Sequence, residues 1–232
     1  MTAQPQQPAQ PEQPAQQQPG PHTLWMMAGG EVTLLPVDLD SGLQRGVITH
    51  WLTGAAGLIV TIGVRTSREA AAMCSGQRVW VSGREAADEE LIVLEVIARR
   101  ACDQDDTTLI LTGVLPLARE RRRSAVRAAT RHPATLTYPD GTTVKGVATD
   151  LSHCGCRIDL NQADLARSVG ATAEVRIELP GNKKFALTAE IMRIDLQTGE
   201  LGMRFEPTEI DLAPIDRLVY ATVKRQKITE EY

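Results

Sequence analysis

The segment HPATLTYPDGTTVKGVATDLS (residues 132–152) holds two runs rich in threonine and valine on either side of Pro139-Asp140-Gly141. Threonine and valine are typical of β-strands, and glycine adopts the positive φ of a tight turn without steric cost. An Asp-Gly pair between two such runs is a strong signal for a β-hairpin. The sequence therefore predicts two paired antiparallel strands over 134–138 and 142–151.

Four further runs of strand length follow this hairpin and are separated by turn residues. They are CRIDL (156–160), AEVRIEL (173–179), KFALTAEIMRID (184–195) and ELGMRFE (200–206). Six short strands joined by tight turns favour a closed antiparallel barrel, because closure leaves no exposed sheet edge.

A second series of short apolar runs precedes the hairpin. It comprises EVTLLPV (31–37), GVITHWL (46–52), GLIVTIGV (57–64), QRVWVSG (77–83), ELIVLEVIAR (90–99) and TTLILTGVL (107–115). These runs predict another small antiparallel barrel or sandwich. SREAAAMC (67–74) is interpreted as a helical turn or a loop. The fold class is thus mainly all-β, with two small antiparallel β-barrels in tandem.

The two ends of the chain differ from this pattern. The N-terminal stretch is almost entirely proline, glutamine and alanine, which predicts a disordered tail. Near the C-terminus, Leu212, Ile215, Leu218 and Val219 recur at helical spacing behind Asp211, which is placed to cap a C-terminal α-helix. That helix either packs across the barrel mouth or mediates self-association. The predicted domains are 1–22 (tail), 23–117 (N-terminal barrel) and 118–232 (C-terminal barrel with its arginine-rich linker and helix).

Composition narrows the classes of function. The chain has 25 basic and 29 acidic residues and a formal net charge of −4, which does not predict a general affinity for DNA or anionic membranes. No run approaches the roughly 18 apolar residues of a membrane span, and the N-terminus does not resemble a secretory signal. Four scattered cysteines fit a reducing, cytoplasmic location. Cys154 and Cys156 stand beside His153, but no second pair at ligand spacing accompanies them, so we predict no metal site.

Basic charge is concentrated in RERRRSAVRAATR (119–131), which holds six arginines and one glutamate. Such a segment between two domains is a solvated linker, a nucleic-acid patch or a site for a compact phosphorylated ligand. Arginine suits the last role because it forms forked hydrogen bonds to phosphate and stacks on π systems. Within the run, Arg123 and Arg127 form Arg-x-x-x-Arg, and Asp150, Ser152 and Gly155 form Asp-x-Ser-x-x-Gly downstream.

These two motifs, in this order and with the Asp-Gly hairpin between them, resemble the signature of PilZ domains, bacterial receptors for cyclic di-GMP. The resemblance covers roughly 119–228, including ELGMRF as the closing strand. It implies that Arg123, Arg127, Asp150, Ser152 and Gly155 contact the ligand. Further expected contacts are Arg122, beside the pair, and Arg157, on the next strand. The remaining basic residues of the run, Arg119, Arg121 and Arg131, are interpreted as solvated neighbours.

The function predicted on this resemblance is that of a receptor and not an enzyme. The two-barrel order resembles the flagellar-brake type of PilZ protein. Binding of cyclic di-GMP is expected to order the arginine segment, change the domain arrangement and thereby regulate an unidentified motor, export or regulatory protein. No cofactor other than the ligand, no membrane insertion and no direct DNA binding are expected, and a homodimer is left open.

Two alternatives remain at this stage. One is a PilZ-like adaptor that binds no nucleotide, against which the intact motifs argue. The other is a small-barrel nucleic-acid-binding protein, which would present stacking aromatic residues. Tyr138, Phe185 and Phe205 are few and dispersed along the sequence, which argues against that class.

Overall fold

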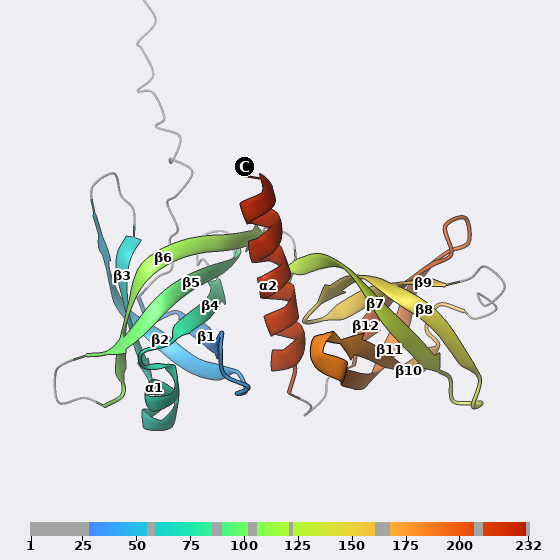
Figure 1. Ribbon diagram of the computed structural model, residues 1–232, viewed down its shortest axis with the longest axis horizontal. Coiled ribbons are helices and arrows are strands. Elements are labelled where there is room, and N and C mark those ends of the chain that lie inside the picture. Colours follow the sequence, from blue (N-terminus) through green and yellow to red (C-terminus); the bar gives the residue numbers. More distant parts are fainter. Residues whose placement is uncertain are drawn as a thin grey trace, which may run out of the picture.

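A computed structural model of the chain describes residues 28–54, 59–84, 90–101, 106–120, 123–160, 168–206 and 211–230. Within these residues the chain forms twelve β-strands and two α-helices (Figure 1). The tail predicted at 1–22 lies outside the described residues. None of the helices in the described part of the chain is long and apolar enough to cross a membrane.

The first six strands close into an antiparallel barrel in the order β1-β2-β3-β6-β5-β4. They are β1 (Glu31–Pro36), β2 (Gln44–Thr53), β3 (Ile59–Thr66), β4 (Arg78–Arg84), β5 (Leu91–Arg100) and β6 (Thr108–Glu120). Between β3 and β4, the segment left open as a turn or loop is helix α1 (Arg68–Cys74). Its first turn is capped by Ser67, whose hydroxyl accepts a hydrogen bond from the backbone N–H of Ala70 at 3.1 Å.

The second barrel closes in the order β10-β11-β12-β9-β8-β7. Its strands are β7 (Arg127–Thr137), β8 (Thr143–Ser152), β9 (Gly155–Leu160), β10 (Thr172–Leu179), β11 (Lys183–Asp195) and β12 (Glu200–Phe205), with a 3₁₀ turn at Pro180–Asn182. The predicted hairpin joins β7 to β8: Gly141 has φ of +83° and Asp140 Oδ1 accepts from the backbone N–H of Thr142 at 2.9 Å. The all-β prediction with two tandem barrels is confirmed.

The arginine-rich run is mostly strand. β6 was predicted to end at residue 115 but continues to Glu120, which pairs with Leu91 of β5, and β7 begins at Arg127. Arg119 is exposed, as expected for a solvated neighbour, but its guanidinium also donates to the fully buried carboxylate of Glu90. The connection between the barrels is therefore much shorter than the charged run.

Helix α2 (Ala213–Glu230) lies between the two barrels (Figure 1). Asp211 Oδ1 accepts from the backbone N–H of Ala213 at 2.9 Å, which caps the first turn as predicted. Buried residues of α2, such as Ile215 and Val219, belong to one apolar cluster with the interior of the second barrel. That cluster also includes residues on the outside of the first barrel: Leu35, Trp80, Val93 and Leu117. The two barrels thus share a core through α2.

Aromatic and polar contacts reinforce this junction. Trp80 and Tyr220 meet edge to face, with ring centroids 5.7 Å apart. Glu95, on β5, accepts from Trp80 Nε1 at 3.0 Å and from Lys224 Nζ of α2 at 2.6 Å. In the loop after β1, Asp40 Oδ2 accepts a hydrogen bond from Lys183 Nζ of β11 at 2.7 Å. This hydrogen bond and the charge of the ammonium group lower the pKa of Asp40.

Candidate functional site

Strand register aligns the motif residues in two rows across the outside of the second barrel. In one row Arg204 of β12 is opposite Gly155 of β9, which is opposite Ser152 of β8, which is opposite Arg127 of β7. In the next row the residues run Arg193, Gly202, Arg157 and Asp150, from β11 to β8. Each row therefore contains one glycine, without a side chain: Gly155 lies between Arg204 and Ser152, and Gly202 lies between Arg193 and Arg157.

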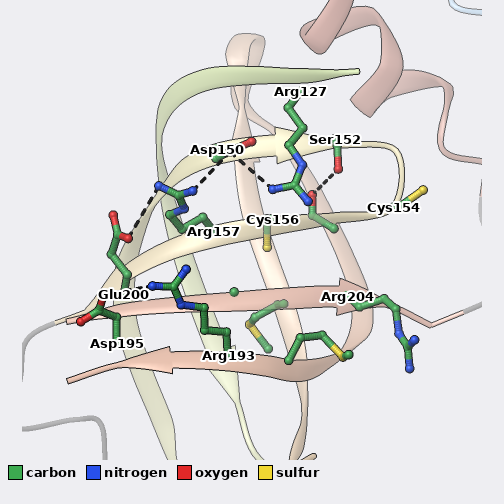
Figure 2. Close-up of a pocket in the computed structure, with 14 residues that line it drawn as sticks. Arg127, Asp150, Ser152, Cys154, Cys156, Arg157, Arg193, Asp195, Glu200 and Arg204 are labelled. Atoms are coloured by element: carbon green, nitrogen blue, oxygen red, sulfur yellow. Dashed lines mark hydrogen bonds and ion pairs between the residues drawn. The ribbon is translucent and has the colours of Figure 1, made fainter. Parts of the chain in front are cut away.

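A cavity of about 370 Å³ lies over these rows (Figure 2). Its size is within the range of small-molecule sites. It is lined by Arg127, Asp150, Ser152, Cys154, Gly155, Cys156, Arg157, Met192, Arg193, Asp195, Glu200, Gly202, Met203 and Arg204. Of the residues predicted to bind ligand, Arg127, Asp150, Ser152, Gly155 and Arg157 are brought together here.

The charges around the cavity are four arginines and three carboxylates, which favours an anionic ligand. Asp150 lies between two of the arginines: its Oδ2 is 3.8 Å from Arg127 Nη1 and 4.0 Å from Arg157 Nη2. Arg157 also approaches Glu200, at 3.6 Å. These long ion pairs hold the guanidinium groups at the cavity and leave them roughly half exposed, so their donors can turn to a ligand.

Ser152 and Gly155 shape the hairpin that carries the motif. Ser152 is buried, and its hydroxyl donates to the backbone carbonyl of Gly155 at 3.0 Å. A Cβ on Gly155 would lie 2.2 Å from the carbonyl oxygen of Met203, a backbone atom of β12. Gly155 was expected to contact the ligand, and the structure shows in addition that its missing side chain allows the close approach of the neighbouring strand β12.

The first arginine of the pair is not at the cavity. Arg123 has a side chain that is 55% exposed, lies 3.9 Å from Glu120 and does not line the cavity. Arg122 lies outside the described residues. Between Arg123 and Arg127 the chain is anchored: Ala125 and Val126 are buried, and Ser124 Oγ is 3.4 Å from Cys154 Sγ. The segment expected to be a flexible joint thus makes apolar contacts of its own.

The turn between β8 and β9 also contacts α2. His153 Nδ1 lies 2.9 Å from Oδ2 of Asp216, a buried carboxylate in the first turn of the helix. The hydrogen bond to Asp216 raises the pKa of His153, with the carboxylate charge adding to it and partial burial opposing it. His153 occupies one of the variable positions of Asp-x-Ser-x-x-Gly, and no pattern in the sequence points to its partner.

Sequence reasoning missed the residues that β11 and β12 supply. Arg193, Asp195, Glu200 and Arg204 stand outward on these strands, as their exposed or half-buried state reflects. Period-two alternation could have assigned them to the outer face, but only the pairing of β12 with β9 brings them beside the motif. Arg204 is held by Glu190 at 2.6 Å.

The cysteines near the motif differ in environment. Burial raises the pKa of Cys156 to about 12, so its thiol remains neutral, while Cys154 is half-buried at the cavity. In the described part of the chain, no three His, Cys, Asp or Glu residues are grouped as metal ligands would be.

Comparison with known proteins gives one family match and several structural likenesses. Residues 121–221 match the PilZ domain model. YcgR from Escherichia coli, solved in complex with c-di-GMP, is 13% identical, with a TM-score of 0.41 and 88% of each chain covered. The Bacillus subtilis inhibitor of motility MotI/DgrA is 12% identical, with a TM-score of 0.39, 89% of this chain and 100% of that chain covered. The search of curated proteins gave no match.

The matched residues run from the arginine-rich segment, through all six strands of the second barrel, into α2. They include both motifs and every residue that lines the cavity. The chain thus carries a PilZ domain, preceded by a separate β-barrel.

Proposed function

We propose that this protein is a cytoplasmic receptor for cyclic di-GMP, and that it regulates a partner protein when the ligand binds. The observation that carries the proposal is the cavity in which Arg127, Asp150 and Arg157 converge within the PilZ domain. A receptor role fits PilZ domains as a class. It requires that the cavity bind the ligand and does not require that it catalyse a reaction.

The chemistry of the cavity suits a cyclic dinucleotide. Arg127 and Arg157 offer forked donors to phosphate oxygens, and such charge-assisted hydrogen bonds are among the strongest in proteins. Asp150 offers a carboxylate to the N–H edge of a guanine. Ligand phosphates would draw Arg127 and Arg157 away from Asp150, which frees its oxygens for the base. The existing ion pairs, at 3.8 and 4.0 Å, are long enough for this exchange to be inexpensive.

Transmission to the rest of the molecule would run through two contacts of the β8–β9 turn. His153 is bonded to Asp216 at the start of α2, and Cys154 contacts Ser124 in the segment between the barrels. Both α2 and that segment contribute to the apolar cluster shared with the first barrel. A ligand that repositions the turn would therefore bias the placement of the barrels, by as much as its affinities for the two placements differ.

Calorimetric titration of the full chain with cyclic di-GMP tests the proposal. We expect saturable binding by the wild type and a loss of about 10-fold or more in affinity for Arg127→Ala and Asp150→Ala, because each removes a charge-assisted contact. Arg131→Ala is the matched control: Arg131 is exposed on the same strand, belongs to the same basic run and does not line the cavity.

Arg123→Ala tests the remaining member of the motif. A loss of affinity comparable to that of Arg127→Ala would mean that the segment around Arg123 closes over the ligand. Absence of saturable heat in the wild type would refute the receptor proposal, and equal losses for Arg131→Ala and Arg127→Ala would reduce it to nonspecific attraction by the basic run.

A further inference from the structure

The outer face of β12 has a gap at Gly202, between two arginines. Gly202 pairs with Arg157 of β9 on one side and with Arg193 of β11 on the other. Neighbouring strands are about 4.8 Å apart, so the Cα atoms of Arg157 and Arg193 are separated by about 9 to 10 Å. An added Cβ on Gly202 would meet nothing closer than Arg193 Cβ at 3.5 Å. The gap is therefore open space and not a site of tight backbone packing.

A β-bulge sets the position of Arg193. The register of β11 against β12 shifts between Ile191 and Arg193, which leaves Met192 as the extra residue. As a result Met192 and Arg193 are both exposed, and both line the cavity. In a regular strand only one of two consecutive side chains faces outward. The bulge turns both Met192 and Arg193 outward, which enlarges the exposed surface beside the gap.

Arg193 can leave its present partner at little cost. It lies 3.3 Å from Asp195, and its side chain is 75% exposed. Asp195 Oδ1 also accepts from the backbone N–H groups of Gln197 at 3.0 Å and Thr198 at 3.2 Å. The carboxylate therefore stays hydrogen-bonded inside its turn when the guanidinium moves away. Arg204 differs, since its 2.6 Å contact with Glu190 directs it away from the gap.

We propose that a purine base of the ligand lies over Gly202, between the guanidinium groups of Arg157 and Arg193, which form a stacking subsite at the β11–β12 side of the cavity. This inference rests on the proposed function and extends it to residues outside the two motifs. A planar base contacts each flanking plane at about 3.5 Å, so the two guanidinium planes need to be about 7 Å apart. Side chains that lean inward from Cα atoms 9 to 10 Å apart meet that requirement.

With this subsite, the ligand would occupy two parts of the cavity. Arg127, Asp150 and Ser152 stand at the β7–β8 side, whereas Gly202 and Arg193 stand two to three strands further around the barrel. A ligand with two guanine bases on a compact ring can place one base at each side. Stacking on guanidinium is tolerant of base identity, so this subsite contributes affinity for a purine ring, while the carboxylates supply hydrogen-bond selectivity.

The test is titration of the full chain with cyclic di-GMP, using three substitutions in the subsite. Arg193→Ala removes one stacking plane, Gly202→Val fills the gap, and Arg193→Lys keeps the charge but loses the plane. We expect each to weaken binding, by about 10-fold for the first two and about 5-fold for the third. Arg176→Ala is the control, because Arg176 is exposed on β10 and pairs with Glu174 two residues away at 3.2 Å, as Arg193 pairs with Asp195.

The outcomes separate this inference from the proposed function. If the wild type does not bind cyclic di-GMP, the proposed function itself fails. If Arg127→Ala loses affinity while Arg193→Ala and Gly202→Val bind within about 2-fold of the wild type, only the stacking subsite is overturned. Wild-type affinity for Arg193→Lys alone would likewise overturn stacking, since charge without a plane would suffice. Thermal midpoints recorded for every variant separate lost binding from lost folding.

Discussion

His153 belongs to the turn of the Asp-x-Ser-x-x-Gly motif, yet its hydrogen bond is to helix α2. Asp216 is 3% exposed, and its carboxylate accepts from the imidazole at 2.9 Å. A carboxylate this deeply buried is stabilised when its partner is cationic. One side chain in the turn between β8 and β9 is therefore bonded to the helix that lies between the barrels.

This pair gives a pH dependence of known sign. The pKa of His153 is raised in the folded protein, so the protonated pair stabilises the fold fully below the unfolded value of about 6.5 and loses its contribution as the pH rises through the folded value. We expect the difference in unfolding free energy between wild type and His153→Gln to be largest near pH 5.5 and to shrink towards about pH 8.5. Urea unfolding of both proteins across this range measures it.

A difference that stayed constant with pH would mean that His153 contributes by packing or by a neutral hydrogen bond. Because the imidazole is 42% exposed, solvent screening limits the pair to roughly 1 kcal/mol.

At the scale of elements, β5 is buried on both of its faces. Val93 and Glu95 alternate with the interior residues Ile92, Leu94 and Val96, yet all five are buried. Val93 belongs to the apolar cluster that α2 joins, and Glu95 is bonded to Lys224 of α2. Glu95 is the polar member of this covered face. It accepts from Trp80 Nε1 and from Lys224 Nζ, and so links two strands to the helix.

Removal of this carboxylate should be costly. Glu95→Ala leaves the indole N–H and the ammonium group without their acceptor at a largely buried site, and we expect a loss of about 2 to 4 kcal/mol in unfolding free energy. Glu95→Gln retains an acceptor for Trp80 and should lose less. Guanidinium unfolding of both variants provides the measurement, with Glu174→Ala, in an exposed ion pair, as the control. If Glu95→Ala and Glu174→Ala lost the same unfolding free energy, water would have replaced the missing carboxylate at the interface, and the expected cost would be refuted.

The strands could be predicted because their residues alternate and their turns contain Asp-Gly or Pro-Gly, as at Asp140-Gly141 and Pro180-Gly181. The bulge at Met192 and the extension of β6 to Glu120 could not, because strand register depends on partners distant in the sequence. The apolar run ELIVLEVI (90–97) indicated a strand, but not the contact of its outer face with Lys224 of α2, which is more than a hundred residues away. For the same reason, the sequence did not predict that Arg193 and Arg204 line the candidate site.

For the whole molecule, the shared core predicts that the barrels unfold together. Tyr220 packs against Trp80 across the junction, and burial raises its pKa. We expect a single calorimetric transition for the wild type. Tyr220→Ala should remove about 3 kcal/mol or more of stabilisation at the junction and separate the unfolding of the two barrels.

Small-angle scattering gives an independent measurement of the same variant. Separation of the barrels should increase the radius of gyration of Tyr220→Ala relative to the wild type. Two resolved transitions in the wild type, or an unchanged radius in a variant that has lost the Trp80–Tyr220 contact, would contradict a shared core that fixes the domains.

The path of α2 has a consequence for how this chain can be divided. The PilZ match ends at Ala221, in the middle of a helix that continues to Glu230. Beyond that point Lys224 bonds to Glu95 and Lys227 donates to the carbonyl of Pro116, both in the first barrel. Tyr220 and Arg217, earlier in the helix, also contact the first barrel or the loop after β1. A chimera that exchanges the N-terminal barrel should therefore exchange α2 from Arg217 onward with it, since the boundary between the two halves of this protein lies within a helix and not in the linker.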